Sequence, residues 1–296
     1  MNKHAYILAM VLIVFISGCV EGESTFSIFG LDIGPGDPLY TTSENLRIET
    51  EVIPSEIYEG KSTTLFFDIY NTGNTTLKSI NAEITDLGGF TASESSKFID
   101  ELEEGEIESW SWKLDSGHTE VHSNINQVLR YKLSYNSNSY AMYDIVAMSE
   151  DEYTRLEREG KLDEEINLFY YKTKSPVEID LSISKDQPLF EGLELYLYVT
   201  LSDMGTGTVK QINARDLVIY YPSDIITYQE SSDLSNPEEG KLLLRYDTKF
   251  YNKKTKKLTC KFKVNDVNIR DIRQFKVNAN YIYDYYKTIN IKVKPK

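Results

Sequence analysis

Two cysteine thiols, Cys19 and Cys260, are the strongest nucleophiles that the sequence contains. Cys260 alternates with Leu258 and Phe262, which is the pattern of a strand that buries one face. A thiol inside a core packs as a small hydrophobe and is not activated for attack. A Gly-x-Ser-x-Gly elbow, which would present a serine nucleophile instead, does not occur in the sequence. We therefore expect a protein that is not an enzyme and that needs no cofactor.

His118 and His122 come closest to a metal-site pattern, with Glu120 between them. A spacing of four would place both imidazoles on one face of a helix, where they could bind Zn²⁺ together. On a strand the same residues stand more than about 12 Å apart. The order of the residues also differs from His-Glu-x-x-His. We favour a loop with solvated histidines and assign no metal site.

The segment Asp100–Glu106 carries five carboxylates in seven residues. Oxygen ligands wrapped around a turn would bind Ca²⁺, and Gly105 permits such a turn. The EF-hand pattern is absent, which favours a solvated acidic turn. Binding of a divalent ion at residues 100–106 stays open as the alternative.

Cys19 follows an apolar run, Ala5–Ile16, which has the length of a signal-peptide core and is too short to span a bilayer. The tetrapeptide Ile16-Ser17-Gly18-Cys19 resembles the lipobox of prokaryotic lipoproteins, in which small residues precede the cleavage site and cysteine follows it. By this resemblance residues 1–18 are a signal peptide, and Cys19 carries a lipid that anchors the protein to the extracytoplasmic side of the cell membrane. A secreted protein with a chance cysteine is the alternative. Residues 19–44, rich in Gly, Pro and Ser, are then a tether.

The formal net charge of −14 argues against a nucleic-acid partner, because phosphate binding needs a basic face. One basic cluster stands out between strand-like flanks, formed by Lys253, Lys254, Lys256 and Lys257. A basic hairpin tip can bind an anionic membrane, the acidic first half of the chain, or an anionic surface polymer. Lysines also protect sheet edges from unwanted pairing, and that is the simplest interpretation.

Tyr281, Tyr283 and Tyr285 lie on one face of a strand if the strand continues through them. Exposed tyrosine strips bind sugars or proteins, because their ring faces are apolar and their hydroxyls are wet. Tyrosines also pack the interiors of sandwiches, and we favour that interpretation here. Asn74 begins the sequon Asn74-Thr75-Thr76 on an expected turn, so it is a predicted glycosylation site where the host has the enzyme.

Short strands separated by turn residues fill most of the chain, which is typical of an antiparallel sandwich. The expected strands in the first part are residues 46–52, 63–70, 77–84, 107–114, 127–135 and 140–148. Those in the second part are residues 177–184, 194–201, 209–221, 242–248, 258–264, 274–283 and 288–293. A capping box that begins at Ser149, with Gly160 after it, predicts one helix over Glu150–Glu159.

The chain repeats itself, since Glu59–Ala82 aligns without gaps on Glu191–Ala214. The identical pairs are Glu59/Glu191, Gly60/Gly192, Leu65/Leu197, Gly73/Gly205, Thr76/Thr208, Lys78/Lys210, Ile80/Ile212, Asn81/Asn213 and Ala82/Ala214. The two aligned segments lie about one domain length apart in the sequence, and self-similarity at such an offset indicates duplication of a whole domain. We therefore expect two domains, at residues 45–175 and 176–296.

The segment Tyr58-Glu59-Gly60, followed by Tyr70-Asn71-Thr72-Gly73-Asn74, resembles the CARDB and related immunoglobulin-like families of prokaryotic surface proteins. The second repeat departs from this pattern, with Asp203-Met204-Gly205 in place of Asn-Thr-Gly. The resemblance implies an all-β fold of two tandem immunoglobulin-like antiparallel sandwiches, with the short helix near the end of the first. Those families act as spacers, adhesion modules and binding modules, and they share no catalytic residues.

These observations together predict a non-catalytic cell-surface lipoprotein that binds or spaces other proteins of the envelope. The alternative is a surface lipoprotein that binds carbohydrate or an anionic polymer through the tyrosine strip and the lysine hairpin.

Overall fold

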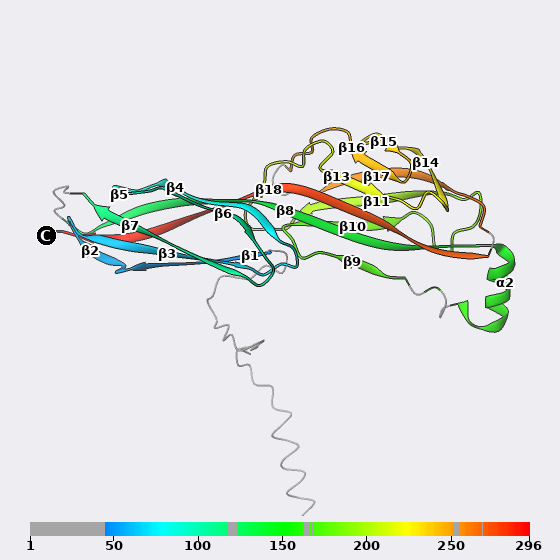
Figure 1. Cartoon of the computed structure of the whole chain (residues 1–296), viewed down its shortest axis with the longest axis horizontal. Helices are drawn as coiled ribbons and strands as arrows, with labels where there is room; N and C mark the ends of the chain where they lie inside the picture. The colour runs from blue at the N-terminus through cyan, green and yellow to red at the C-terminus, as the bar shows by residue number, and fades with distance from the viewer. Residues whose placement is uncertain (1–44, 118–122, 163–165, 167, 251–254, 268) are drawn as a thin grey trace, which may run out of the picture. The chain divides into compact units, whose positions relative to one another are not determined.

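The computed structural model describes residues 45–117, 123–162, 166, 168–250, 255–267 and 269–296, all of which belong to one compact unit, Thr41–Lys296. Antiparallel strands dominate, and the predicted all-β sandwich class is confirmed (Figure 1). The predicted helix is also present as α2 (Glu150–Glu159). The Ser149 side chain accepts a hydrogen bond from the N–H of Glu152 at its start, and Gly160 ends it in the left-handed conformation. Among the residues that the structure describes, no helix is long and apolar enough to cross a membrane.

The strands follow the order of the two repeats. The first repeat supplies β1 (Leu46–Ile53), β2 (Glu56–Tyr58), β3 (Ser62–Asn71), β4 (Leu77–Asp86), β5 (Phe90–Ala92), β6 (Ser96–Leu102), β7 (Ile107–Ser116) and β8 (Ile125–Met148). The rest of the chain supplies β9 (Tyr170–Lys172), β10 (Val177–Ile183), β11 (Glu194–Asp203), β12 (Thr208–Val209), β13 (Leu217–Tyr220), β14 (Ile226–Glu230), β15 (Leu234–Glu238), β16 (Lys241–Leu244), β17 (Lys256–Val264) and β18 (Arg270–Lys294).

Two small sheets and one large sheet make two sandwiches. The small sheets have the orders β1-β3-β7-β5 and β10-β11-β17-β14, and the large sheet has the order β15-β16-β13-β18-β8-β4-β6. In the first sandwich the ring of Phe67 on β3 packs edge-on against Tyr131 on β8, with centroids 4.8 Å apart. In the second, Phe262 on β17 packs against Phe275 on β18 at 5.4 Å. The large sheet therefore serves both cores.

Strands β8 and β18 form an antiparallel ribbon that runs through both sandwiches. Their pairing begins with Ile125 opposite Val293 and ends with Met148 opposite Arg270, without a break in register. The last part of β18, which belongs to the second repeat, lies in the first sandwich, where β2 pairs with it in parallel. The expected boundary between residues 175 and 176 therefore does not separate two independent sheets, because each sandwich takes a strand from the other repeat.

The sequence predicts a break in each long strand where the structure has none. In β8 the expected break falls at Asn136–Ser139, whose residue types are common in turns. The alternation of burial continues through it, with Ser137 and Ser139 buried on the inner face and Asn136 and Asn138 on the outer face. Serine can occupy the inner face because hydrogen bonds satisfy its hydroxyl there.

The duplicated segments occupy equivalent places in the two small sheets. Gly60 and Gly192 precede β3 and β11 with φ values of 71° and 75°, a region that glycine enters at low cost. At the other ends of these strands, Asn71 pairs with the first residue of β1, and Asp203 pairs with the first residue of β10. The aligned repeat therefore marks a repeated structural unit.

If the ribbon couples the sandwiches, a cavity in the last part of β18 destabilises the first sandwich. Ile291 is fully buried, and we expect Ile291→Ala to lower the free energy of unfolding by about 2–5 kcal/mol. The two tryptophans of the chain, Trp110 and Trp112, both lie in β7, so their fluorescence reports the unfolding of the first sandwich. Thr288→Ala, an exposed change on the same strand, is the control. A tryptophan transition that is unchanged in Ile291→Ala would contradict the coupling.

Candidate binding surfaces

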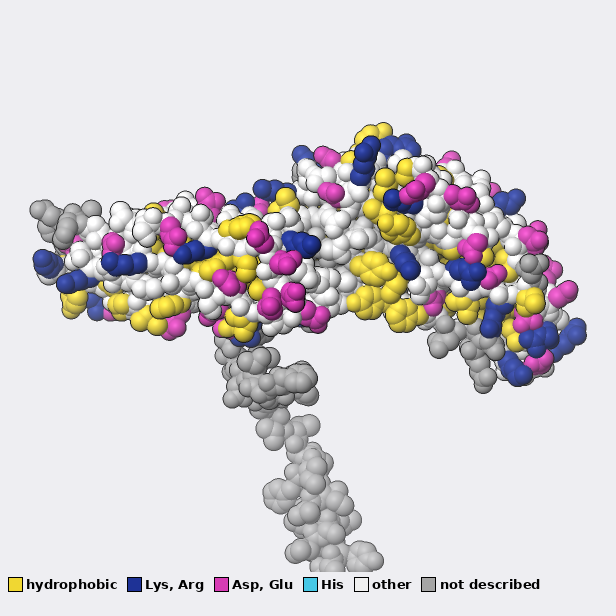
Figure 2. All heavy atoms as spheres, viewed as in Figure 1, with side chains coloured by type: hydrophobic (Ala, Val, Ile, Leu, Met, Phe, Trp, Pro, Cys, Tyr) yellow, Lys and Arg dark blue, Asp and Glu magenta, His cyan; other side chains and the backbone are white. Residues whose placement is uncertain are grey.

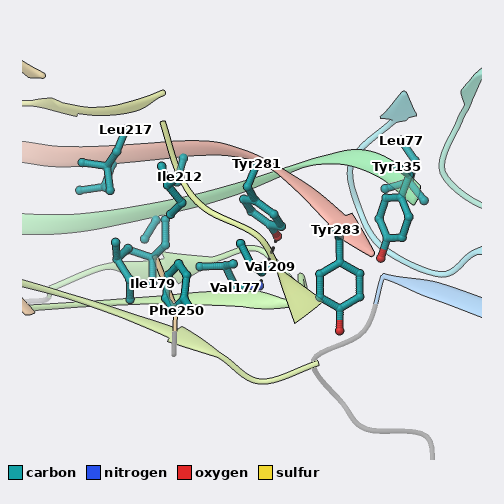
Figure 3. Packing of buried hydrophobic residues seen from close by; sticks show 14 of the residues in the cluster. Leu77, Tyr135, Val177, Ile179, Val209, Ile212, Leu217, Phe250, Tyr281 and Tyr283 are labelled. Carbon is teal, nitrogen blue, oxygen red and sulfur yellow. Dashed lines mark hydrogen bonds between the residues drawn. The ribbon is translucent and has the colours of Figure 1, made fainter. Parts of the chain in front are cut away.

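The tyrosine strip of β18 packs inside the protein. Tyr281 and Tyr283 are 3% and 1% exposed, and Figure 3 shows them among apolar side chains such as Val177 and Val209. Tyr285 is half-buried, with its ring centroid 6.5 Å from that of Tyr131. Of the two interpretations of this strip, interior packing holds, and the ring faces of Tyr281 and Tyr283 do not form a surface site.

Two glycines make room for Tyr283. The N–H of Gly207 donates a hydrogen bond of 2.5 Å to the Tyr283 hydroxyl. A Cβ atom on Gly205 would overlap that hydroxyl, and one on Gly207 would overlap the backbone oxygen of Asp284. Close packing against β18 therefore requires glycine at both of these positions in the turn after Asp203.

A buried polar cluster lies where the two sandwiches meet; we call it the waist cluster. Its members are Asn45, Tyr135, Ser137, Ser139, Ser175 and Tyr281. On one side Asn45 donates to the Ser137 hydroxyl at 2.8 Å and accepts from the Tyr135 hydroxyl at 3.0 Å. On the other side the Ser139 hydroxyl lies 2.7 Å from that of Ser175 and 2.9 Å from that of Tyr281. These mutual hydrogen bonds offset the cost of burying polar groups.

Asp284 is a buried carboxylate beside the waist cluster. Its side chain is 2% exposed and lies 3.2 Å from the Lys132 amine and 3.3 Å from the Lys210 amine. The Ser134 hydroxyl donates to it at 2.6 Å. Burial raises the pKa of Asp284, but the hydrogen bonds from Ser134 and Lys132, with the charges nearby, outweigh it and lower the pKa below its usual value. The group therefore acts as an ionised structural anchor between β8, β18 and Lys210, which directly follows β12.

The described lysines of the basic hairpin contact their own chain. Lys256 forms an ion pair with Asp233 at 3.1 Å. The Lys257 amine lies 3.7 Å from the centroid of the Tyr198 ring, which is a cation–π geometry. Lys253 and Lys254 lie outside the described residues. The intramolecular contacts of Lys256 and Lys257 support a structural role for at least these two members of the predicted site.

Cys260 lies in the core, as the alternation predicts. It is fully buried on the inner face of β17, and burial, assisted by the nearby Asp233 charge, raises the pKa of its thiol to about 12. Cys19, His118 and His122 lie outside the described residues, so their predicted roles stay predictions.

The acidic segment Asp100–Glu106 ends β6 and turns into β7. Gly105 has a φ of 77°, and the Glu106 carboxylate accepts a hydrogen bond of 2.8 Å from the N–H of Glu103. Within the described ranges no group of three or more His, Cys, Asp or Glu side chains is arranged to hold a metal ion. The geometry of Glu103 and Glu106 is that of a turn closed by its own side chain.

An exposed aromatic edge is the surface feature that the sequence analysis missed. Phe169 is 49% exposed, and its ring is parallel to that of Tyr171 within 4°, with centroids 6.4 Å apart. Tyr140 on β8 adds a third ring, 6.4 Å from Tyr171. Figure 2 shows the hydrophobic patch over β9, beside an uncharged surface over the middle of β8 and β18. The run of three aromatic residues, Phe169–Tyr171, was the signal available in the sequence.

Asn74 belongs to the same edge. It lies in the turn between β3 and β4, and its side-chain Nδ2 donates a hydrogen bond of 2.6 Å to the Tyr171 hydroxyl. The first sandwich therefore contacts the aromatic edge of the second through the predicted glycosylation site. Modification of Asn74 would place a sugar directly beside Tyr171.

The ionised Asp284 anchor makes stability depend on pH. Because its pKa is lowered in the fold, its contribution is present above the ordinary aspartate pKa of about 4 and is lost as the pH falls through the lowered value. We expect Asp284→Asn to cost about 1–3 kcal/mol at neutral pH, with a difference from the wild type that narrows below about pH 4. Urea unfolding over a pH series measures this. Asp266→Asn, at an exposed position, is the matched control, and an equal effect of both changes would contradict the anchor.

The raised pKa of Cys260 predicts a silent thiol. In a Cys19→Ser variant, where Cys260 is the one remaining cysteine, we expect a disulfide reagent to react slowly with the native protein near about pH 8 and rapidly after unfolding. Absorbance of the released thiolate measures both rates. Fast reaction of the native protein would show that Cys260 is accessible and activated.

Comparisons with known proteins assign no family. No protein-family model matches the chain, and neither does any curated protein. Among solved structures, red sea bream transglutaminase has a TM-score of 0.21 at 9% identity, over 84% of this chain and 32% of that one. Escherichia coli alpha-2-macroglobulin activated by porcine elastase has a TM-score of 0.20 at 11% identity, over 86% of this chain and 22% of that one. The chain thus spans less than a third of either protein, and both similarities are too weak to carry an argument about fold or function.

Proposed function

We propose that this protein is a non-catalytic module of the cell surface that is anchored through a lipid on Cys19 and holds or spaces a protein partner in the envelope. The observation that carries the proposal is the β8–β18 ribbon, which passes from one sandwich into the other without a break in register. A spacer must keep its length and direction, and a continuous pair of strands resists bending where a flexible linker would not. The ribbon therefore suits a protein that fixes the distance between its two ends.

The sequence adds two supports to this proposal. The lipobox-like Ile16-Ser17-Gly18-Cys19 gives the means of anchoring. The resemblance of Tyr58–Gly60 and Tyr70–Asn74 to CARDB-like domains points to families that act as surface spacers and adhesion modules. Neither support depends on an enzymatic site.

Binding of a carbohydrate or an anionic polymer is the second candidate. The tyrosine strip no longer favours it, because Tyr281 and Tyr283 are buried, and Lys256 and Lys257 are engaged within the chain. The exposed aromatic edge around Tyr171 favours it instead, since aromatic rings on a surface suit sugars as well as proteins.

Chemical crosslinking on intact cells, followed by mass spectrometry, tests the first candidate. We expect reproducible crosslinks to one envelope protein, made from the lysines of one sandwich. We expect Cys19→Ser to leave the membrane fraction and to lose those crosslinks, because the anchor sets where the module can reach. The proposal fails if the abundant wild-type protein gives no protein crosslinks. The anchor fails separately if Cys19→Ser stays with the membranes.

A further inference from the structure

On the outer face of the large sheet, aromatic rings stand beside a row of asparagine amides; we call this surface the aromatic–amide face. Its members are Phe169, Tyr171, Tyr140, Asn138, Asn278 and Asn280. Backbone register places them together, since Tyr171 lies opposite Met142 on β8, while Tyr140 and Asn138 lie opposite Asn278 and Asn280 on β18. Residues from three strands therefore meet on one surface.

The rings of this face are held in place by the backbone and by polar contacts. The N–H of Phe169 donates to the buried Asp144 carboxylate at 3.0 Å, which fixes the start of β9. Asn74 holds the Tyr171 hydroxyl from the other sandwich. Because Phe169 and Tyr171 are parallel within 4°, they present ring faces in a common orientation. A ligand that stacks on them would lose little binding free energy to reordering of the protein.

The amides supply unused hydrogen-bonding capacity. Asn138 donates from Nδ2 to the side-chain oxygens of both Asn278 and Asn280, the second at 2.8 Å. The Nδ2 groups of Asn278 and Asn280 donate to no side chain or backbone oxygen within the described part of the chain, and each carries two N–H donors. The row therefore offers donors to a ligand on the outer side of the sheet.

The face is nearly free of charge. On β8 between Asn136 and Met142, and on β18 between Lys276 and Ile282, the outward positions of the two strands carry a single charged side chain, Lys276. Anionic polymers need several cations, so this composition favours a neutral ligand. A protein interface of high affinity places a desolvated apolar centre inside a polar rim, whereas here the rings lie to one side and amides fill the middle.

We propose that the aromatic–amide face binds a neutral glycan. Pyranose rings have apolar C–H faces that stack on aromatic rings, and their hydroxyls match the donors and acceptors of asparagine amides. One sugar would stack on Phe169 and Tyr171, and the next residues of the glycan would follow the amide row along β18. The glycan is a free polysaccharide of the envelope, and a sugar attached at Asn74, whose Nδ2 lies beside Tyr171, would compete with it for the same face. Binding of a neutral glycan here rests on the second candidate function, whose ligand class it specifies, and it is independent of the spacer role.

Affinity electrophoresis tests the proposal. The full-length protein is made in a host without N-glycosylation, extracted in a detergent without a sugar headgroup, and run in native gels that contain hydroxyethyl cellulose, glycol chitin or a soluble mannan. We expect at least one of these neutral polysaccharides to retard the wild type. Phe169→Ala and Asn280→Ala are each expected to raise the dissociation constant by about tenfold.

Phe98→Ala is the matched control, because Phe98 is 58% exposed on β6, away from the aromatic–amide face. Absence of retardation by every neutral polysaccharide overturns the proposal, and so does retardation that Phe169→Ala leaves unchanged. If Phe169→Ala abolishes a protein crosslink on cells and affects no polysaccharide, the face belongs to a protein partner. Protein from a glycosylating host distinguishes the sources. If that protein is not retarded and Asn74→Gln restores the retardation, the attached glycan occupies the same face.

Discussion

The backbone hydrogen bonds between β8 and β18 hold strands from two repeats together across both sandwiches. Pairs such as Ile125 with Val293 join residues that are far apart in the sequence, so the entropy of closing a long loop must be offset by many contacts formed together. Neither sandwich is complete until both repeats are present. The duplication in the sequence has thus produced a single interdependent unit, in which the second repeat supplies a strand of the first core.

The waist cluster shows how the ribbon crosses from one sandwich to the other. Apolar residues at this point would oppose a shift by one residue, which exposes the buried face, but would distinguish less well between registers that differ by two residues. Ser137, Ser139 and Tyr281 instead need particular partners, and a shift by two residues, which keeps them on the inner face, would bury their hydroxyls away from these partners. The ionised Asp284 adds the same kind of constraint beside the cluster, since it is satisfied only with Ser134 and the two lysines in place. Buried polar groups therefore fix the register of the ribbon here.

Sequence patterns predicted most of the local structure and little of its long-range assembly. The capping residues around α2 and the alternation around Cys260 gave correct elements, because these depend on neighbours in the chain. The continuity of β8 was missed because Asn136–Ser139 has the composition of a turn, and the partners that satisfy its serines, such as Asn45 and Ser175, are distant in sequence. The same limit applies to binding sites. Tyr281 and Tyr283 belong to an obvious strip in β18 but are buried, while the exposed face combines residues from three separate strands.

Rigidity connects the fold with both proposed roles. A surface module that bends at its middle would present its ligand-binding side chains at changing distances, and each ordering step would weaken binding. Here the same two strands that stiffen the junction also carry Tyr140, Asn138, Asn278 and Asn280 on their outer side. The inner side of the ribbon is fixed by the waist cluster, so the positions of the outer side chains are fixed with it. A mutation in the waist cluster would therefore disturb the side chains of the outer face although it replaces none of them. Changes to the outer amides would leave the junction between the sandwiches intact. This asymmetry separates effects on binding from effects on the spacer, and it follows from the alternation of side chains along a single pair of strands.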